Sequence, residues 1–146
     1  MSLHSYTKIW LNLIWETHNR ERLLFNETAK KVSGFLFKYS MEKNIYMNIN
    51  YVSPEHVHSI IDLPANINIE DSFKLLKGAS SHYINQERLI PGKFSWGRGY
   101  AAFSVSESQL NKVIDYIKNQ KEHHKIKSFA EEYEEFLTKH NLVINR

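Results

Sequence analysis

The alternation of apolar and polar residues predicts that the chain begins with a β-strand. Between Ile9 and Trp15 every second residue is apolar, and a period of two places these residues on one face of a strand. Trp10 and Ile14 add apolar side chains to the opposite face. We therefore expect this strand to be a central one.

Two later segments have the spacing of amphipathic helices. The first is expected to begin with Asn26 as its N-cap and to end at residues 42–44, and the second has a candidate cap at Asn68 and runs to about Gln86. The expected core-facing residues are Ala29, Val32, Phe35, Leu36 and Tyr39 in the first helix and Phe73, Leu76, Ala79, Tyr83 and Ile84 in the second.

Three more strands are expected, at residues 45–52, 56–63 and 100–105. Pro54 separates the first two, because proline has no N–H to give to a ladder, so these two form a hairpin. Residues 87–99 contain Pro91 and three glycines and are expected to be irregular, with Phe94, Trp96 and Arg98 exposed.

Two helices are expected after the last strand. The segment from Ser106 to Gln109 has the spacing of a capping box and precedes apolar residues at helical period. Ser128 is a candidate cap for a short final helix.

This βαββαβ order predicts an α+β fold of the ferredoxin-like (RRM-like) type. Such an order folds most simply as a four-stranded antiparallel sheet with two helices on one face, and the two C-terminal helices are additions to it. With 146 residues and 42% hydrophobic content, the chain is expected to form a single domain over residues 1–146.

The composition is compatible with many functions, but it indicates which partners and which cellular compartment to expect. The net charge of +3 and the eight histidines permit a nucleic-acid partner without establishing one. The chain has no cysteine, no apolar run long enough to span a bilayer and no signal segment. A cytoplasmic protein that does not enter a membrane is therefore the expectation.

The first candidate for chemistry is the pair His56 and His58. Two residues apart on a strand, they should project from one face, and imidazole is the commonest metal ligand among side chains. The pair could bind a metal, or it could be part of a polar strand edge.

The second candidate is the pair Tyr116 and Gln120. Four residues apart in the predicted helix, they lie on one face beside its apolar stripe. Both could look into a cleft, or they could be a partly packed tyrosine beside a solvated glutamine.

Together these motifs resemble the single-tyrosine HUH transposases of the insertion-sequence 200/605 type. The resemblance covers nearly the whole chain, from Trp15-Glu16-Thr17-His18-Asn19-Arg20 through the histidine pair to the segment around Tyr116 and then to Ser128-Phe129-Ala130-Glu131-Glu132-Tyr133. It implies an enzyme that cuts and rejoins single-stranded DNA at hairpin-bearing element ends through a 5′-phosphotyrosine, and that works as a homodimer. By position, Tyr116 matches the nucleophile, His56 and His58 the metal ligands, and Gln120 the third ligand.

The side chains themselves are suited to this chemistry. Two imidazoles and an amide oxygen leave a divalent ion, Mg²⁺ or Mn²⁺, with open positions for phosphate oxygens, and such an ion acts as a Lewis acid. Tyr116 has an ordinary pKa near ~10 and needs the metal-held phosphate or a nearby base to become a nucleophile. Asp62 could lie near the metal or merely end its strand.

DNA contacts are harder to assign. Lysines and small polar residues of the second helix could grip phosphates or be simply solvated, and loop aromatics could stack on bases or fold back on the domain. The candidates are Lys74, Lys77, Ser80, Ser81, Trp96 and Arg98.

Three other functions remain open. One is a domesticated repeat-processing HUH endonuclease, and another is a replication or plasmid-transfer nuclease, although such enzymes usually have longer chains. The third is a non-catalytic module that binds single-stranded nucleic acid, although no RNA-recognition motif is visible.

Overall fold

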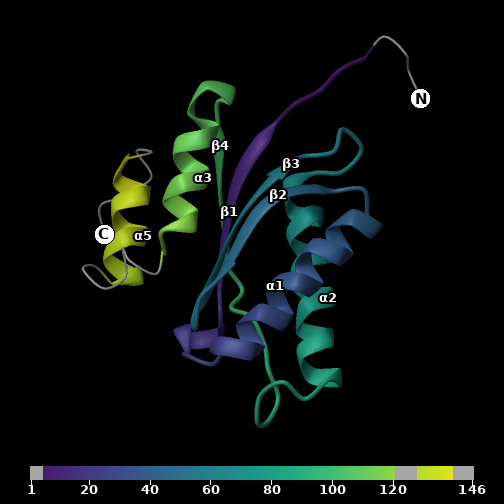
Figure 1. The fold of residues 1–146 in the computed structure, drawn as a ribbon, viewed down its shortest axis with the longest axis vertical. Helices are drawn as coiled ribbons and strands as arrows, with labels where there is room; N and C mark the ends of the chain where they lie inside the picture. The colour runs from purple at the N-terminus through teal and green to yellow at the C-terminus, as the bar shows by residue number, and fades with distance from the viewer. Residues whose placement is uncertain (1–4, 121–127, 140–146) are drawn as a thin grey trace.

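The computed structural model describes residues 5–120 and 128–139. These residues form four strands, four α-helices and two short 3-10 helical turns, and Figure 1 shows how the strands and α-helices are arranged. In chain order they are β1 (Trp10–Glu16), η1 (His18–Arg20), α1 (Asn26–Glu42), β2 (Tyr46–Val52), β3 (His56–Asp62), α2 (Ile69–Gln86), β4 (Ala101–Val105), η2 (Glu107–Gln109), α3 (Leu110–Lys118) and α5 (Phe129–Lys139).

The four strands form one antiparallel sheet in the order β2-β3-β1-β4. β1 is therefore central, as its two apolar faces predicted. The hairpin of β2 and β3 is confirmed, and in the register of β1 with β3, Ile14 faces His58 and Glu16 faces His56. This order with two helices on one face is the ferredoxin-like arrangement expected from the sequence.

Helices α1 and α2 cover one face of the sheet (Figure 1). The core between them contains Leu13 and Trp15 of β1, Leu36 of α1, and Phe73 and Leu76 of α2. All five are 1% exposed or less, so this face of the sheet is filled by an apolar core.

The second face of the sheet is covered by the C-terminal helices α3 and α5, which lie on the side opposite α1 and α2 (Figure 1). Leu110 and Ile117 of α3 pack against Trp10 and Ile60. Tyr133 of α5 packs in a second cluster, with Ile14 and Phe103. Burial of these apolar groups holds both helices over the sheet.

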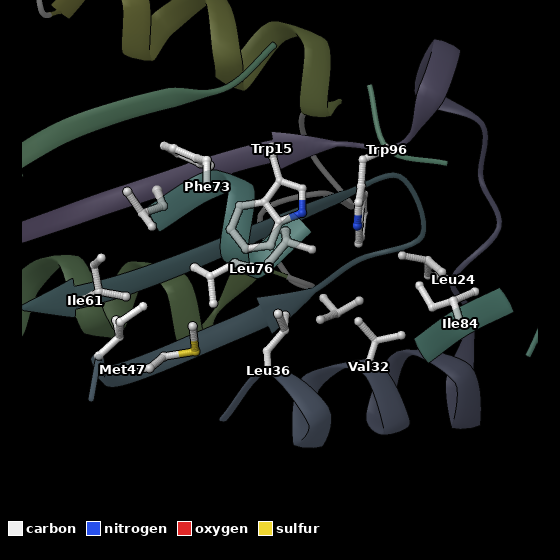
Figure 2. Close-up of a cluster of buried hydrophobic side chains, with 14 of the residues drawn as sticks. Trp15, Leu24, Val32, Leu36, Met47, Ile61, Phe73, Leu76, Ile84 and Trp96 are labelled. Atoms are coloured by element: carbon white, nitrogen blue, oxygen red, sulfur yellow. The ribbon is translucent and has the colours of Figure 1, made fainter. Parts of the chain in front are cut away.

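The loop before β4 differs from expectation. Phe94 and Trp96 are buried, not exposed, at 1% and 8% exposure, and the Trp96 ring lies edge-on to Trp15 at 5.9 Å between centroids (Figure 2). The Trp96 Nε1 donates to the Ser80 hydroxyl at 2.9 Å. Glycine and proline predicted the irregular backbone, but they carry no information about where the aromatic side chains point.

Two details of the last helices also differ. Ser106 makes no side-chain cap to α3, and its hydroxyl instead meets that of Ser108 at 3.2 Å, so the predicted capping box is not formed. A 3-10 turn precedes the helix instead. Ser128 does cap α5, because its hydroxyl accepts from the Glu131 N–H at 3.2 Å.

Within the described residues, no helix combines the length and the apolarity that a bilayer crossing requires.

Candidate active site

The histidine pair lies on the second face of the sheet, as the two-residue spacing predicted. His56 and His58 are 0% and 2% exposed, and their ring centroids are 5.3 Å apart. Between them, Val57 points into the opposite core. The strand therefore holds two imidazoles close together under the C-terminal helices.

The orientation of His56 is fixed by its neighbours. Its Nδ1 lies 2.5 Å from the Ser53 hydroxyl and 3.1 Å from Glu55 Oε1, and the Ser53 hydroxyl donates to the same carboxylate oxygen at 3.0 Å. With Ser53 donating to Glu55, Nδ1 must carry the proton and donate to both oxygens. Nε2 is then the nitrogen whose lone pair can bind a cation.

Glu55 is itself held in the ionised form. Burial raises the pKa of its carboxyl, but the hydrogen bonds from His56 and Ser53, together with the electrostatic attraction of the His56 ring N–H and of the Arg22 guanidinium, outweigh burial and lower the pKa to about 2. Arg22 contributes through a 2.5 Å ion pair to Oε2. The sequence reasoning assigned no role to Glu55, although its place next to a histidine was visible.

Tyr116 and Gln120 converge on a carboxylate of α5. The Tyr116 hydroxyl donates to Glu132 Oε1, and Gln120 Nε2 donates to the same oxygen at 3.0 Å. The sequence predicted Tyr116 and Gln120 on one continuous helix. In the structure α3 ends at Lys118, so Gln120 lies two residues beyond its end. The shared carboxylate nevertheless keeps the two side chains together.

This environment disfavours the phenolate of Tyr116. Burial, the hydrogen bond to Glu132 and the negative charge of Glu132 raise its pKa above the ordinary tyrosine value, and a hydrogen bond with Gln120 only partly opposes them. The hydroxyl is therefore protonated at neutral pH, and its oxygen must lose the proton during any attack.

Glu132 was also missed, although the sequence held a signal for it. It lies three residues after Phe129 and next to Tyr133, in the helical stripe that the apolar residues of α5 define. An acid in such a stripe is buried and needs partners. The structure shows Glu132 at 5% exposure, with Tyr116 and Gln120 as those partners.

Tyr51 connects the two halves of this site. It pairs with His58 across the β2–β3 ladder, and its ring lies 6.4 Å from that of His56. Burial raises the pKa of Tyr51, and the charges of Glu55 and Glu132 raise it further. The two carboxylates, from the turn before β3 and from α5, therefore act on the same small region.

The residues present are suited to a divalent cation. Gln120 is 0% exposed, and its Oε1 has no hydrogen-bond partner in the described part of the chain. A buried amide oxygen without a donor is costly, and a cation supplies what it lacks. No group of three or more His, Cys, Asp or Glu gathers among residues 5–120 and 128–139, so a three-ligand site requires Gln120. His123 and His124, which we expect not to be ligands, lie outside the described residues.

The expected DNA contacts divide into three kinds. Ser80 and Trp96 are buried and bonded to each other, so Trp96 folds back on the domain, which is one of the two alternatives left open for the loop aromatics. Lys77 donates to the backbone oxygens of Gly97, Arg98 and Gly99, at 2.7, 3.4 and 3.3 Å, and so fastens the loop. Lys74 and Arg98 are exposed, and Ser81 is half-buried.

Asp62 belongs to the far end of β3. Its carboxylate accepts from the Ile9 N–H at 2.9 Å and pairs with Lys8 at 3.6 Å. It ends the strand.

Comparison with known proteins shows which family the chain resembles. The family model described as "Transposase IS200 like" matches residues 5–120. The ISDra2 transposase TnpA of Deinococcus radiodurans is 27% identical over 114 residues, which are 75% of this chain and 81% of that protein. The IS200 element transposase of Salmonella typhimurium is 26% identical over 121 residues, 79% of this chain and 78% of that protein.

Two solved structures are similar to this fold. A candidate transposase from Deinococcus radiodurans has a TM-score of 0.66 and 26% identity over 82% of this chain and 96% of that chain. A REP-associated tyrosine transposase bound to a REP hairpin has a TM-score of 0.60 over 85% of this chain and 74% of that chain, and at 16% identity it supports the fold alone. The chain belongs to the IS200-like transposase family.

Proposed function

We propose that this transposase cleaves and rejoins single-stranded DNA at hairpin-bearing element ends, through a covalent bond between Tyr116 and a 5′-phosphate. The observation that carries the proposal is the convergence of Tyr116 and Gln120 on Glu132, over the sheet face that presents His56 and His58. The proposed nucleophile on α3, the two histidines on β3 and Gln120 just after α3 therefore belong to the same side of the sheet.

The proposed reaction is a balanced transesterification. The Tyr116 oxygen attacks the phosphorus, the bond from phosphorus to the 3′ oxygen breaks, and the phenolic proton passes by way of the site to the departing 3′ oxygen. One phosphodiester bond is exchanged for another, so a 3′-hydroxyl can later reverse the step and rejoin a strand without an external energy source.

The protein's own residues position this step. Glu132 orients the Tyr116 hydroxyl and the Gln120 amide at the same time, and Glu55 with Ser53 fixes the ring of His56. When bound by His56, His58 and Gln120, a divalent ion, Mg²⁺ or Mn²⁺, would supply Lewis-acid stabilisation of the phosphate charge. The orienting carboxylates remove the need for reorganisation during the reaction.

The test is the double variant His56→Ala/His58→Ala, with His82→Ala as the matched control. His82 is an exposed histidine on α2, away from the site. We expect the double variant to lose Mn²⁺ binding in calorimetry and metal-dependent cleavage of labelled single-stranded DNA from the element's own flanks, while its circular dichroism stays native.

The His82→Ala control should bind Mn²⁺ and cleave as the original protein does. Cleavage by the double variant with an unchanged metal dependence would remove these histidines from the mechanism.

A further inference from the structure

A groove opens beside the candidate active site on the side of Glu55. Its volume is about 860 Å³, within the range of about 300 to 1,000 Å³ that small-ligand sites occupy. It lies between the segment that follows β1, the start of α1 and the start of α5, and its lining includes Arg22, Phe25, Lys30, Tyr51 and Glu55. We name it the Phe25 groove.

The backbone along this groove is strained. Asn19, Arg20 and Asn26 have positive φ angles of 56°, 54° and 45°, and only two other non-glycine residues in the described part of the chain do so. Asparagine enters this left-handed region more readily than other residues with a side chain, whereas an arginine persists there only where the surrounding structure enforces it. Three left-handed residues in so short a segment indicate that its surroundings hold it in place.

Hydrogen bonds fasten this strained segment to the turn before His56. The Thr17 N–H donates to the Glu55 carbonyl at 2.9 Å, and the N–H groups of Leu23 and Leu24 donate to the Pro54 carbonyl at 2.9 and 3.1 Å. Leu24 is fully buried. The segment is thus held at a fixed position relative to the histidine strand.

The fixed segment presents an aromatic ring and positive charge to solvent. Phe25 is 47% exposed, and the Arg22 guanidinium lies 5.8 Å from the centre of its ring. The side chain of Arg22 is 61% exposed while it pairs with Glu55, and that of Lys30 on the next helix is 77% exposed and lies 3.4 Å from the equally exposed Glu27. Exposed aromatic rings beside basic side chains are the features by which proteins hold unpaired nucleotides, through base stacking and phosphate contacts.

We propose that the Phe25 groove binds one unpaired nucleotide of the DNA strand that enters the active site, with its base stacked on Phe25 and its phosphate near Arg22 and Lys30. This inference rests on the proposed function, because that function brings a single strand to His56. The groove adjoins Glu55, the residue before His56, so the nucleotide it holds is a near neighbour of the scissile phosphate. Arg22 would then touch both the DNA and the carboxylate that orients His56.

The stacking part is tested with Phe25→Ala and the matched control Phe37→Ala. Phe37 is an exposed phenylalanine of α1, at 37% exposure, and it does not line the groove. The probes are a fluorescein-labelled oligothymidylate of about 12 nucleotides and an abasic deoxyribose-phosphate strand of the same length, and binding to the full chain is measured by fluorescence anisotropy.

We expect Phe25→Ala to weaken binding of the oligothymidylate by about fivefold or more, which is the lower range of one base–aromatic stack. Its affinity for the abasic strand should equal that of the original protein, because no base is present to stack. Phe37→Ala should change neither affinity.

The phosphate part is tested with Lys30→Ala and Lys31→Ala, which remove equal charge from adjacent positions of α1. Lys30 lines the groove and Lys31 does not. Loss of one phosphate contact lowers the salt dependence of single-strand binding by about 0.7 in the slope of log K against log salt. We expect this change in Lys30→Ala and not in Lys31→Ala.

Several outcomes would overturn the inference. These are no binding of oligothymidylate by the original protein, equal binding by Phe25→Ala and the original protein, or an equal loss on the abasic strand. If one of them occurs while the original protein still forms its covalent adduct, only the groove is refuted. If the base-dependent loss appears but no adduct ever forms, the groove stands and the proposed function fails.

Discussion

Tyr116, the proposed nucleophile, has a buried ring as well as a hydroxyl, and the two can be separated experimentally. Tyr116→Phe removes the oxygen and keeps the ring against the cluster around Ile60. Glu132 Oε1 retains the bond from Gln120, so the loss of stability should be about 1 kcal/mol. We expect cleavage and the protein–DNA adduct to disappear, and DNA binding to persist.

Gel analysis of the adduct with labelled DNA measures this prediction for Tyr116, and Tyr39→Phe on α1 serves as the control. A covalent adduct recovered from Tyr116→Phe and mapped to another residue by peptide mass would contradict the assignment.

Glu132 is a positioning residue for Tyr116, so a conservative variant should rescue part of its function. In Glu132→Gln the amide oxygen can still accept from the Tyr116 hydroxyl and Gln120, whereas Glu132→Ala leaves both without their acceptor. We expect a single-turnover cleavage rate lower by about tenfold or more in the alanine variant, because a small misplacement of reacting groups is costly. The glutamine variant should lie in between.

If the glutamine and alanine variants of Glu132 have equal cleavage rates and equal unfolding midpoints, this carboxylate has no positioning role.

At the scale of elements, the loop between α2 and β4 is held by contacts that its composition did not reveal. Trp96 packs among Trp15 and Phe94 and bonds to Ser80 of α2, while Lys77 bonds to three loop carbonyls. These contacts hold the loop against both α2 and the sheet. Its buried aromatics belong to the core.

Trp96→Phe tests this role. The variant loses the bond from Nε1 to Ser80 and leaves a small cavity, so the free energy of unfolding should fall by about 1 to 3 kcal/mol in denaturant titration. Affinity for single-stranded DNA, measured where the variant is folded, should stay unchanged. A variant of full stability with weakened DNA binding would mean that Trp96 contacts DNA after all.

At the scale of the whole molecule, a homodimer remains a prediction. The aromatic face of the first strand is covered, because Trp10 is 7% exposed beneath α3. The strands at the sheet edges, β2 and β4, are the remaining surfaces of that kind. Tyr46 at the start of β2 is 58% exposed, and an unpaired edge can take a second chain.

Sedimentation velocity at roughly tens of micromolar protein, a concentration at which a specific interface should hold, should show a dimer. Charge substitution at Tyr46, as in Tyr46→Glu, should shift the distribution toward monomer if β2 forms the interface, and an equivalent change at the β4 residue Ser104 serves as the alternative arm. A monomer at all concentrations would end the prediction.

The secondary structure and the common face of the two histidines can be predicted from the amino-acid sequence. Strand and helix order, the central place of β1, the hairpin at Pro54 and the Asn68 cap follow from period, turn residues and capping, which are local properties of the chain. The common face of His56 and His58 follows from the two-residue repeat of any strand. Helical spacing singled out Tyr116 and Gln120, and the family resemblance added their expected roles as nucleophile and third ligand.

The side chains that contact the site residues are known only from the tertiary structure. Glu132 meets Tyr116 across sixteen positions, and Arg22 meets Glu55 across thirty-three, because packing of α5 and of the segment after β1 brings them there. Trp96 was expected to be exposed, because its burial depends on the space that α2 and β1 leave beside the loop, and the sequence of the loop carries no information about that space. Periodicity reports which way a side chain points from its own element, and it carries no information about which distant group meets it.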